Sequence, residues 1–327
     1  MTTLTMAKSI NEALRRAMKE DDRVIVLGED VGRLGGVFRI TDGLLNDFGA
    51  NRVIDTPLAE SAIMGVAVGL AMRGLRPIVE IQFDGFLFPA FDQLVSQVAK
   101  QYARSAGNTK MAMTIRIPYG GGIGAVEHHS ESPEAYMVAT PGLRVVTPAT
   151  PADAYAMTQQ AIASDDPVIV LEPKRRYWEK GEVDLDAAVA SFEPLHQARV
   201  VRPGTDCTVI GYGPTVRTCI EAAAAAALEG HSLEVIDLRS IAPLDDVIVF
   251  ESVRRTGRVV IVHEAPVIGG VGAELAARIT EHTFYSLEAP VQRVGGWHSP
   301  YPPSRIEDEY LPDVDRILAA VDQTLTA

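Results

Sequence analysis

Glu60 is the first residue whose place in the sequence suggests chemistry. A short apolar segment, Val53-Ile54, is followed by a turn at Pro57, and a run of small and apolar residues then predicts a helix that ends at Gly74. Glu60 lies in the first turn of this helix, where free N–H groups and the positive end of the helix dipole stabilise a carboxylate.

The predicted helix is apolar nearly all round, so we expect it to be buried. Glu60 would then face a dry interior, where an unpaired charge is costly, and it would need a partner that could be a ligand. The alternative is a carboxylate that only caps the helix. The residue types and their spacing leave both interpretations open.

A second candidate is His129, which follows the glycine-rich loop Gly120–Gly124 in the segment Glu127-His128-His129-Ser130. Polar residues that follow a strand of an open α/β sheet lie where such sheets bind ligands. We expect the side chains of His128 and His129 to point different ways, and no third ligand stands at metal spacing. The alternative is a pair of surface histidines.

The elements that would position these residues alternate between strand and helix. Fully apolar strands, such as residues 24–28, are typical of parallel strands covered on both faces. The predicted strands of the first half are residues 24–28, 53–54, 76–81, 111–117, 145–146 and 168–171, and the predicted helices are 1–20, 60–74, 88–106 and 151–164.

A charged stretch with interspersed proline and glycine, residues 181–197, predicts a linker between two domains, 1–180 and 198–327. The second domain repeats the alternation, so the fold class is α/β with two doubly wound, mostly parallel sheets. Its predicted strands are residues 207–211, 233–238, 259–263 and 290–294, and its predicted helices are 216–228, 245–255 and 272–284.

Composition excludes several classes of function. The chain has 327 residues and a net charge of −13, so nucleic acid and anionic membranes should repel it. Cys207 and Cys219 make neither a disulfide framework nor a metal site. No apolar run has the length of a membrane span, and the N-terminal residues predict an amphipathic helix instead of a leader. A reducing, cytoplasmic location is expected.

Six long motifs resemble the beta subunit of the thiamine-diphosphate-dependent decarboxylase of 2-oxo acid dehydrogenase complexes. The resemblance covers essentially the whole chain and implies a transketolase-like pyrimidine-binding domain followed by a transketolase C-terminal-like domain. The motifs are GEDVGRLGGVFRIT at 28–41, DTPLAESAIMGVAVGLAMRG at 55–74, EIQFDGFLFPAFDQ at 80–93, GGIGAVEHHSESPEAY at 121–136, DDPVIVLEPKRRY at 165–177 and VIDLRSIAPLD at 235–245.

The resemblance implies a role for five residues. The family acid that matches Glu60 bonds a nitrogen of the cofactor's aminopyrimidine ring and so promotes formation of the thiazolium ylide. Phe86 matches an aromatic residue, often Tyr, that packs on this ring, and Leu58 and Gln82 match positions that line the same pocket. His129 matches a histidine near the thiazolium and substrate that handles protons or charge. The pattern alone favours a core aromatic at Phe86, and an ordinary polar residue of an amphipathic strand stays an alternative for Gln82.

The resemblance also implies a partner and cofactors. Enzymes of this type bind diphosphate and Mg²⁺ through a Gly-Asp-Gly motif, which this chain lacks. In the family that motif belongs to a separate alpha subunit, two alpha and two beta chains form a heterotetramer, and the complex acylates a lipoylated acyltransferase core. A potassium ion is held there largely by backbone carbonyls. The matching positions are Met111, Met113, Thr114, Ala161, Ser164 and Asp166.

The substrate subtype rests on the segment from His129 to Tyr136, which is most like the branched-chain enzymes although Glu131 replaces their usual Gln. We therefore expect a branched-chain 2-oxo acid, with a pyruvate- or acetoin-type enzyme as the first alternative. Two other classes remain open: the C-terminal half of a split transketolase-like enzyme, and a non-catalytic nucleotide-binding α/β protein. Glycine-rich turns at Gly120–Gly124, Gly211–Gly213 and Gly269–Gly272 are weak phosphate signals.

Overall fold

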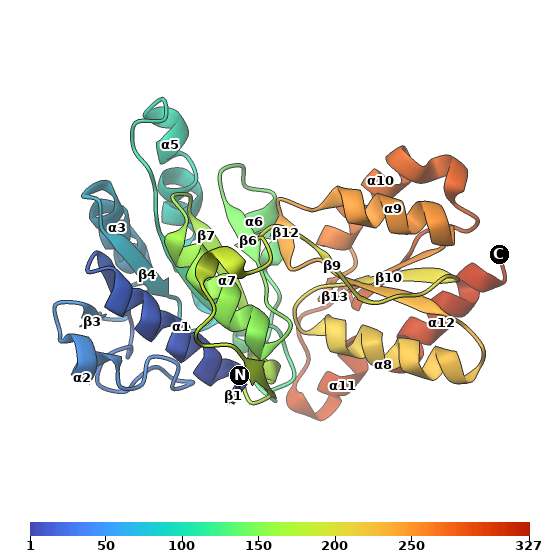
Figure 1. The fold of residues 1–327 in the computed structure, drawn as a ribbon, viewed down its shortest axis with the longest axis horizontal. Helices are drawn as coiled ribbons and strands as arrows, with labels where there is room; N and C mark the ends of the chain where they lie inside the picture. The colour runs from blue at the N-terminus through green and yellow to red at the C-terminus, as the bar shows by residue number, and fades with distance from the viewer. The chain divides into compact units, whose positions relative to one another are not determined.

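The computed structural model describes all 327 residues and divides into two compact units. The first consists of Met1–Tyr119 and Tyr136–Leu195, and the second of Gly120–Ala135 and His196–Ala327. Each is an α/β unit around its own sheet (Figure 1), which confirms the predicted fold class.

Six parallel strands of the first unit lie in the order β6-β7-β5-β4-β2-β3. Its central strands are buried along their whole length, because helices cover both faces of such a sheet. The carboxyl ends of β2, β3 and β4 therefore meet at one edge. The strands are β2 (Val24–Gly28), β3 (Val53–Asp55), β4 (Arg76–Glu80), β5 (Thr114–Tyr119), β6 (Arg144–Val146) and β7 (Val168–Pro173).

Two long helices of this unit, α1 (Met6–Glu20) and α7 (Pro151–Ala163), lie side by side (Figure 1). They pack on the sheet through a core that joins Ile10 and Leu14 of α1 to strands β2 and β4. Both helices begin at a threonine whose hydroxyl accepts a backbone N–H, which satisfies a donor that the helix leaves unpaired.

The helix α3 (Glu60–Met72) contacts β2, β4 and α4 (Leu87–Gln93). The helix predicted for residues 88–106 is interrupted: a π-helical turn at Leu94–Val98 follows α4, and α5 is only Gln101–Arg104. The remaining helices of the unit are α2 (Leu44–Phe48) and, beginning in the second unit, α6 (Glu134–Val138).

The N-terminal helix begins later than predicted, because Thr2–Thr5 form strand β1. This strand pairs antiparallel with β8 (Lys180–Val183), which overlaps the stretch expected to be a linker. Backbone pairing thus ties the chain after β7 to the N-terminus.

The sheet of the second unit has the order β14-β13-β10-β11-β9, and only the edge strand β9 is antiparallel. Helices α8 and α12 cover one face, and α9 and α10 cover the other (Figure 1). Strand β9 and helix α12 were not predicted. The strands are β9 (Arg199–Arg202), β10 (Cys207–Gly211), β11 (Leu233–Asp237), β13 (Val259–Pro266) and β14 (Gln292–Gly296); a short strand β12 spans Ser240–Ala242. The helices are α8 (Thr215–Leu228), α9 (Asp246–Thr256), α10 (Val271–Thr283), α11 (Glu307–Tyr310) and α12 (Val314–Leu325).

No helix combines the length and the apolar character needed to cross a bilayer. Cys207 and Cys219 are free thiols in the buried core, and burial raises the pKa of the Cys207 thiol to about 12.

Candidate functional site

Glu60 is the first residue of α3 and only 6% exposed. Ala59 is the N-cap, and no side chain caps the helix. The Glu60 carboxylate makes no hydrogen bond or ion pair within the chain, although a buried charge ordinarily requires one. The interpretation of Glu60 as a helix cap is therefore not supported, and the carboxylate is available to a ligand.

A second acid near Glu60, missed in the sequence analysis, is Glu29, which directly follows β2. Burial raises the pKa of Glu29, and the neighbouring negative charges of Asp30 and Glu60 raise it further. One carboxylate oxygen of Glu29 is buried without a partner. The signal that could have found it is an acidic pair placed immediately after a fully apolar strand.

The other predicted pocket residues surround this edge of the sheet. Gln82 follows β4, and its side-chain amide lies 3.4 Å from the carboxylate of Asp30. Leu58 is 64% exposed on the turn before α3. Phe86 closes a short 3-10 turn, and its ring meets Phe83 edge to face at 5.9 Å. Carboxylate acceptors, the side-chain amide of Gln82 and the ring of Phe86 therefore lie on neighbouring segments of the first unit.

The chemistry of this set suits a flat heteroaromatic ring that carries N–H donors. Unpaired carboxylates at Glu29 and Glu60 accept hydrogen bonds from such donors, and an aromatic side chain can pack on the ring. The same carboxylates repel a diphosphate. The first unit thus fits the pyrimidine end of thiamine diphosphate and not its anionic end.

The expectation that α3 is buried is wrong for its outer face. Val66 is 56% exposed and Met72 is 52% exposed, and the space beyond Gly65 and Gly69 is open. Small and apolar residues at every third or fourth position form this face, so it is the side of an apolar helix that the single chain leaves uncovered.

A different cluster of acids lies inside the same sheet. Arg116 on β5 donates two hydrogen bonds to Glu172 at 2.7 and 2.9 Å and one to Glu80 at 2.5 Å. The hydroxyl of Tyr177 donates to Glu172 at 2.7 Å. Burial opposes the charge of Arg116, but Glu172 and Glu80 outweigh it and raise the guanidinium pKa. This cluster is paired within the chain and leaves no group for a ligand.

His129 belongs to the second unit, where it ends the short 3-10 helix Glu127–His129. Its Nδ1 lies 2.7 Å from the carbonyl oxygen of His128 and carries the proton in this contact, because a carbonyl only accepts. The rings of His128 and His129 do not diverge as expected: their centroids are 4.3 Å apart, edge to face. No group of three or more His, Cys, Asp or Glu side chains could hold a metal ion.

The glycine loop before His129 does not offer its amides to a phosphate. Glu264 accepts from Gly121 N, and Glu307 accepts from Gly122 N and Gly124 N. The third glycine-rich turn is filled as well, because the ring of His263 lies against Gly270 and Gly272. Side chains of the chain itself therefore occupy these candidate phosphate loops.

The six positions of the predicted potassium site lie around the end of α7 and the start of β5, but several of their carbonyls already accept hydrogen bonds. Ser164 O accepts from Arg76 at 2.9 Å, and Met113 O accepts from Val168 N at 3.0 Å. The Asp166 carboxylate pairs with Arg144. These two guanidinium groups make a poor setting for a cation, and the potassium site stays a prediction.

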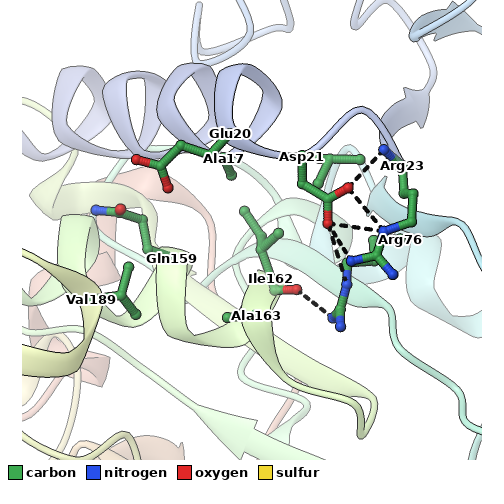
Figure 2. Close-up of a pocket in the computed structure, with 10 residues that line it drawn as sticks. Ala17, Glu20, Asp21, Arg23, Arg76, Gln159, Ile162, Ala163 and Val189 are labelled. Carbon is green, nitrogen blue, oxygen red and sulfur yellow. Dashed lines mark hydrogen bonds and ion pairs between the residues drawn. The ribbon is translucent and has the colours of Figure 1, made fainter.

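A hollow of about 250 Å³ lies at the amino ends of β2 and β4, the opposite end of these strands from Gln82. Figure 2 shows the residues that line it. Arg76 donates there to the carbonyl of Ile162, and Asp21 accepts from Arg23. The pKa of Asp21 falls to about 2, chiefly because of this bond to Arg23. The charged side chains that line the hollow are already paired, so we assign the hollow no chemistry.

Comparison with known proteins gives two domain matches in chain order. Residues 2–179 match "Transketolase, pyrimidine binding domain", and residues 196–317 match "Transketolase, C-terminal domain". The first match contains Glu29, Glu60, Gln82 and Phe86, so the unpaired acids lie in the domain type that binds a pyrimidine.

Relatives match along almost their whole length. The pyruvate dehydrogenase E1 component subunit beta of Leifsonia xyli is 57% identical over 99% of this chain and 95% of the relative. The 3-methyl-2-oxobutanoate dehydrogenase subunit beta of Mycobacterium tuberculosis is 55% identical over 99% and 92%. A solved structure described as a split gene transketolase, inactive beta4 tetramer, superimposes with a TM-score of 0.81 at 25% identity over 99% and 98%.

Proposed function

Since the chain belongs to the family of thiamine-dependent 2-oxo acid dehydrogenase beta subunits, we propose that it acts with an alpha subunit in the oxidative decarboxylation of a branched-chain 2-oxo acid and the reductive acylation of lipoyl groups. The observation that carries this proposal is the buried, unpaired carboxylate of Glu60 beside the similarly unpaired oxygen of Glu29. A structural acid in that position would have a partner within the chain.

In this proposal Glu60 accepts a hydrogen bond from a ring nitrogen of the aminopyrimidine and holds that nitrogen protonated. Phe86 packs on the ring, while Leu58 and Gln82 line its pocket. Bound thiamine diphosphate supplies the electron sink that allows a 2-oxo acid to lose carbon dioxide. His129 holds or transfers a proton near the substrate and the lipoyl group.

The partner in this proposal is an alpha subunit that holds the diphosphate and Mg²⁺. Two features support it: the first unit presents acids to the cofactor site, and the outer face of α3 is apolar and uncovered immediately after Glu60. A protein surface laid on this face would bury it and exclude water from the Glu60 carboxylate. We infer a heterotetramer of two alpha and two beta chains that docks on a lipoylated acyltransferase core.

The substrate subtype is the finest part of the proposal. The relative named for pyruvate is 57% identical to this chain, and the relative named for 3-methyl-2-oxobutanoate is 55% identical. Sequence identity therefore hardly discriminates between the two substrates. The preference for a branched-chain acid rests on the segment from His129 to Tyr136.

The test is reduction of an artificial electron acceptor by the chain co-expressed with its alpha subunit, with thiamine diphosphate and Mg²⁺ present. The substrates are 3-methyl-2-oxobutanoate, 4-methyl-2-oxopentanoate and pyruvate. Glu60→Ala should abolish turnover, whereas Glu274→Ala, which removes an exposed first-turn glutamate of α10, should leave it unchanged.

Turnover of the branched acids supports the family activity and the subtype together. Turnover of pyruvate alone keeps the activity and rejects the subtype. A stable complex that turns over none of the three acids rejects the proposal and favours ketol transfer, the alternative to which the transketolase-like structure points.

A further inference from the structure

Two buried carboxylates of the second unit hold the glycine loop that precedes His129. Glu307, at the start of α11, accepts from Gly122 N at 2.8 Å through one oxygen and from Gly124 N at 3.0 Å through the other. Glu264, at the end of β13, accepts from Gly121 N at 3.1 Å. Three amides of one short loop are thus bound by charged acceptors, which make stronger bonds than neutral ones.

Tyrosines fix the orientation of Glu307. The hydroxyl of Tyr301 donates to Glu307 at 2.6 Å and accepts from Gly122 N at 3.3 Å. Burial and this bond to Glu307 keep the Tyr301 hydroxyl protonated by raising its pKa. The rings of Tyr301 and Tyr310 meet at 4.9 Å, and Leu311 completes a small apolar cluster beneath the loop. The carboxylate therefore has a fixed direction.

The loop conformation depends on glycine. Gly120, Gly122 and Gly124 have φ values of 81°, 84° and 72°, a region that other residues rarely adopt. A Cβ at Gly121 would collide with the hydroxyl of Tyr301. The sequence of the loop is thus suited to close contact with these acids.

The same loop carries His129 between two fixed ends. Gly120 N donates to Glu131 O at 2.9 Å, so the segment 120–131 closes on itself. His129 N donates to Val126 O at 3.0 Å within that closed segment. The four residues between Gly124 and His129 connect the clamped amides to the histidine, so motion of the clamped backbone would move the His129 ring.

We propose that Glu307, with Glu264 and Tyr301, is a positioning residue that sets the His129 ring by clamping the glycine loop. The inference rests on the proposed function of His129, since it assigns that histidine a supporting structure. Neither acid touches the reacting groups in this role; both act through the backbone of the loop.

The test compares Glu307→Gln with Glu309→Gln, an exposed glutamate on the same short helix, in the co-expressed alpha–beta complex. Glutamine keeps the size of Glu307 but is neutral and has one acceptor oxygen, so the amides of Gly122 and Gly124 both lose a charged partner and one of them loses its acceptor. Hydrogen exchange of the peptide 120–131 should become at least tenfold faster in Glu307→Gln only. The kcat for lipoyl acylation should fall about 10²-fold, with the KM of the oxo acid changed less than threefold.

Tyr301→Phe provides a graded check, because it removes one hydrogen bond to Glu307 and leaves the carboxylate in place. It should show the same pattern with a smaller loss. Three results would overturn the proposal. The first is faster hydrogen exchange with an unchanged kcat, and the second is a lower kcat without faster exchange. The third is a change in KM as large as the change in kcat.

An inactive wild-type complex would reject the proposed function without rejecting the clamp. In that case the reaction rate of His129 with diethyl pyrocarbonate, relative to that of the adjacent His128, replaces the kinetics. A ratio that changes at least threefold in Glu307→Gln supports the clamp, and an unchanged ratio overturns it.

Discussion

Two groups of acids in the first unit differ in how they are paired. Glu80 and Glu172 surround Arg116, and every one of these charges has a partner inside the sheet. Glu60 and Glu29 lie past the carboxyl ends of the strands, where Glu60 has no hydrogen-bond partner and one Glu29 oxygen is buried unpaired. Burial of a carboxylate alone therefore does not distinguish a structural acid from a functional one.

The difference lies in what the fold gains from each group. The Arg116 cluster ties β4, β5 and β7 together, and removing one member would leave an uncompensated charge in the core. Burial, together with the negative charges of Asp30 and Glu60, raises the pKa of Glu29, so the fold holds this group of acids at a loss of stability. We infer that a ligand compensates for that loss.

The largest expected effect comes from Arg116→Met, which keeps an unbranched side chain in place of the aliphatic part of arginine and removes the guanidinium charge. Glu80 and Glu172 would then be buried without a counter-ion, so the free energy of unfolding should fall by about 3–5 kcal/mol. Urea titration followed by circular dichroism measures the change.

The matched control is Arg23→Met, in which the arginine pairs with Asp21 at the surface. This variant should unfold close to the wild-type midpoint, because exposed pairs add little. Equal destabilisation by both variants would contradict a special role for the buried cluster.

A smaller effect is expected from Tyr177→Phe, which removes the hydrogen bond to Glu172 and leaves a fully buried ring in place. The loss should be about 1–2 kcal/mol, since Glu172 still has two bonds from Arg116. The variant should keep its turnover in the alpha–beta complex. A loss of turnover without a loss of stability would contradict a purely structural role for this cluster.

The smallest effect, with the opposite sign, is expected from Glu29→Gln in the chain without cofactor. The pKa of Glu29 is raised in the folded state, because folding disfavours its ionised form. This carboxyl group therefore makes the folded protein less stable as the pH rises from the ordinary glutamate pKa through the raised one. Glutamine removes this penalty. The melting temperature should therefore exceed that of wild type at pH 7–8, and the gain should vanish at about pH 4. A variant that melts lower at pH 7 would contradict the like-charge account.

Much of the fold could be predicted because its strands are short apolar runs with helices between them. The strand at 24–28 was predicted with its observed bounds, and Glu60 was predicted to lie in the first turn of its helix. The antiparallel strand β9 and the pairing of β1 with β8 could not be predicted, since neither follows the alternation and both depend on distant partners.

The site was predicted unevenly for a physical reason. Glu60 stands out because it begins an apolar helix, whereas the acidic pair that contains Glu29 gains its meaning only when folding brings Glu29 near Glu60. The clamp on the glycine loop joins residues 121–124 to Glu264 and Glu307, more than 140 positions away, so no local pattern could indicate it. The outer face of α3 shows a different limit of the sequence. An apolar helix is expected to be buried, but its sequence does not indicate whether its own chain or a partner chain covers it.

The most direct test of the account is Glu60→Gln in the alpha–beta complex, with thermal stability measured with and without thiamine diphosphate beside turnover of the 2-oxo acids. The account predicts that, without cofactor, the variant is at least as stable as wild type, because it loses an unpaired buried charge. It also predicts that the stabilisation by thiamine diphosphate is reduced and that turnover falls by about 10²–10⁴-fold. A variant that is less stable without cofactor yet turns over normally would make Glu60 a structural acid and contradict the account.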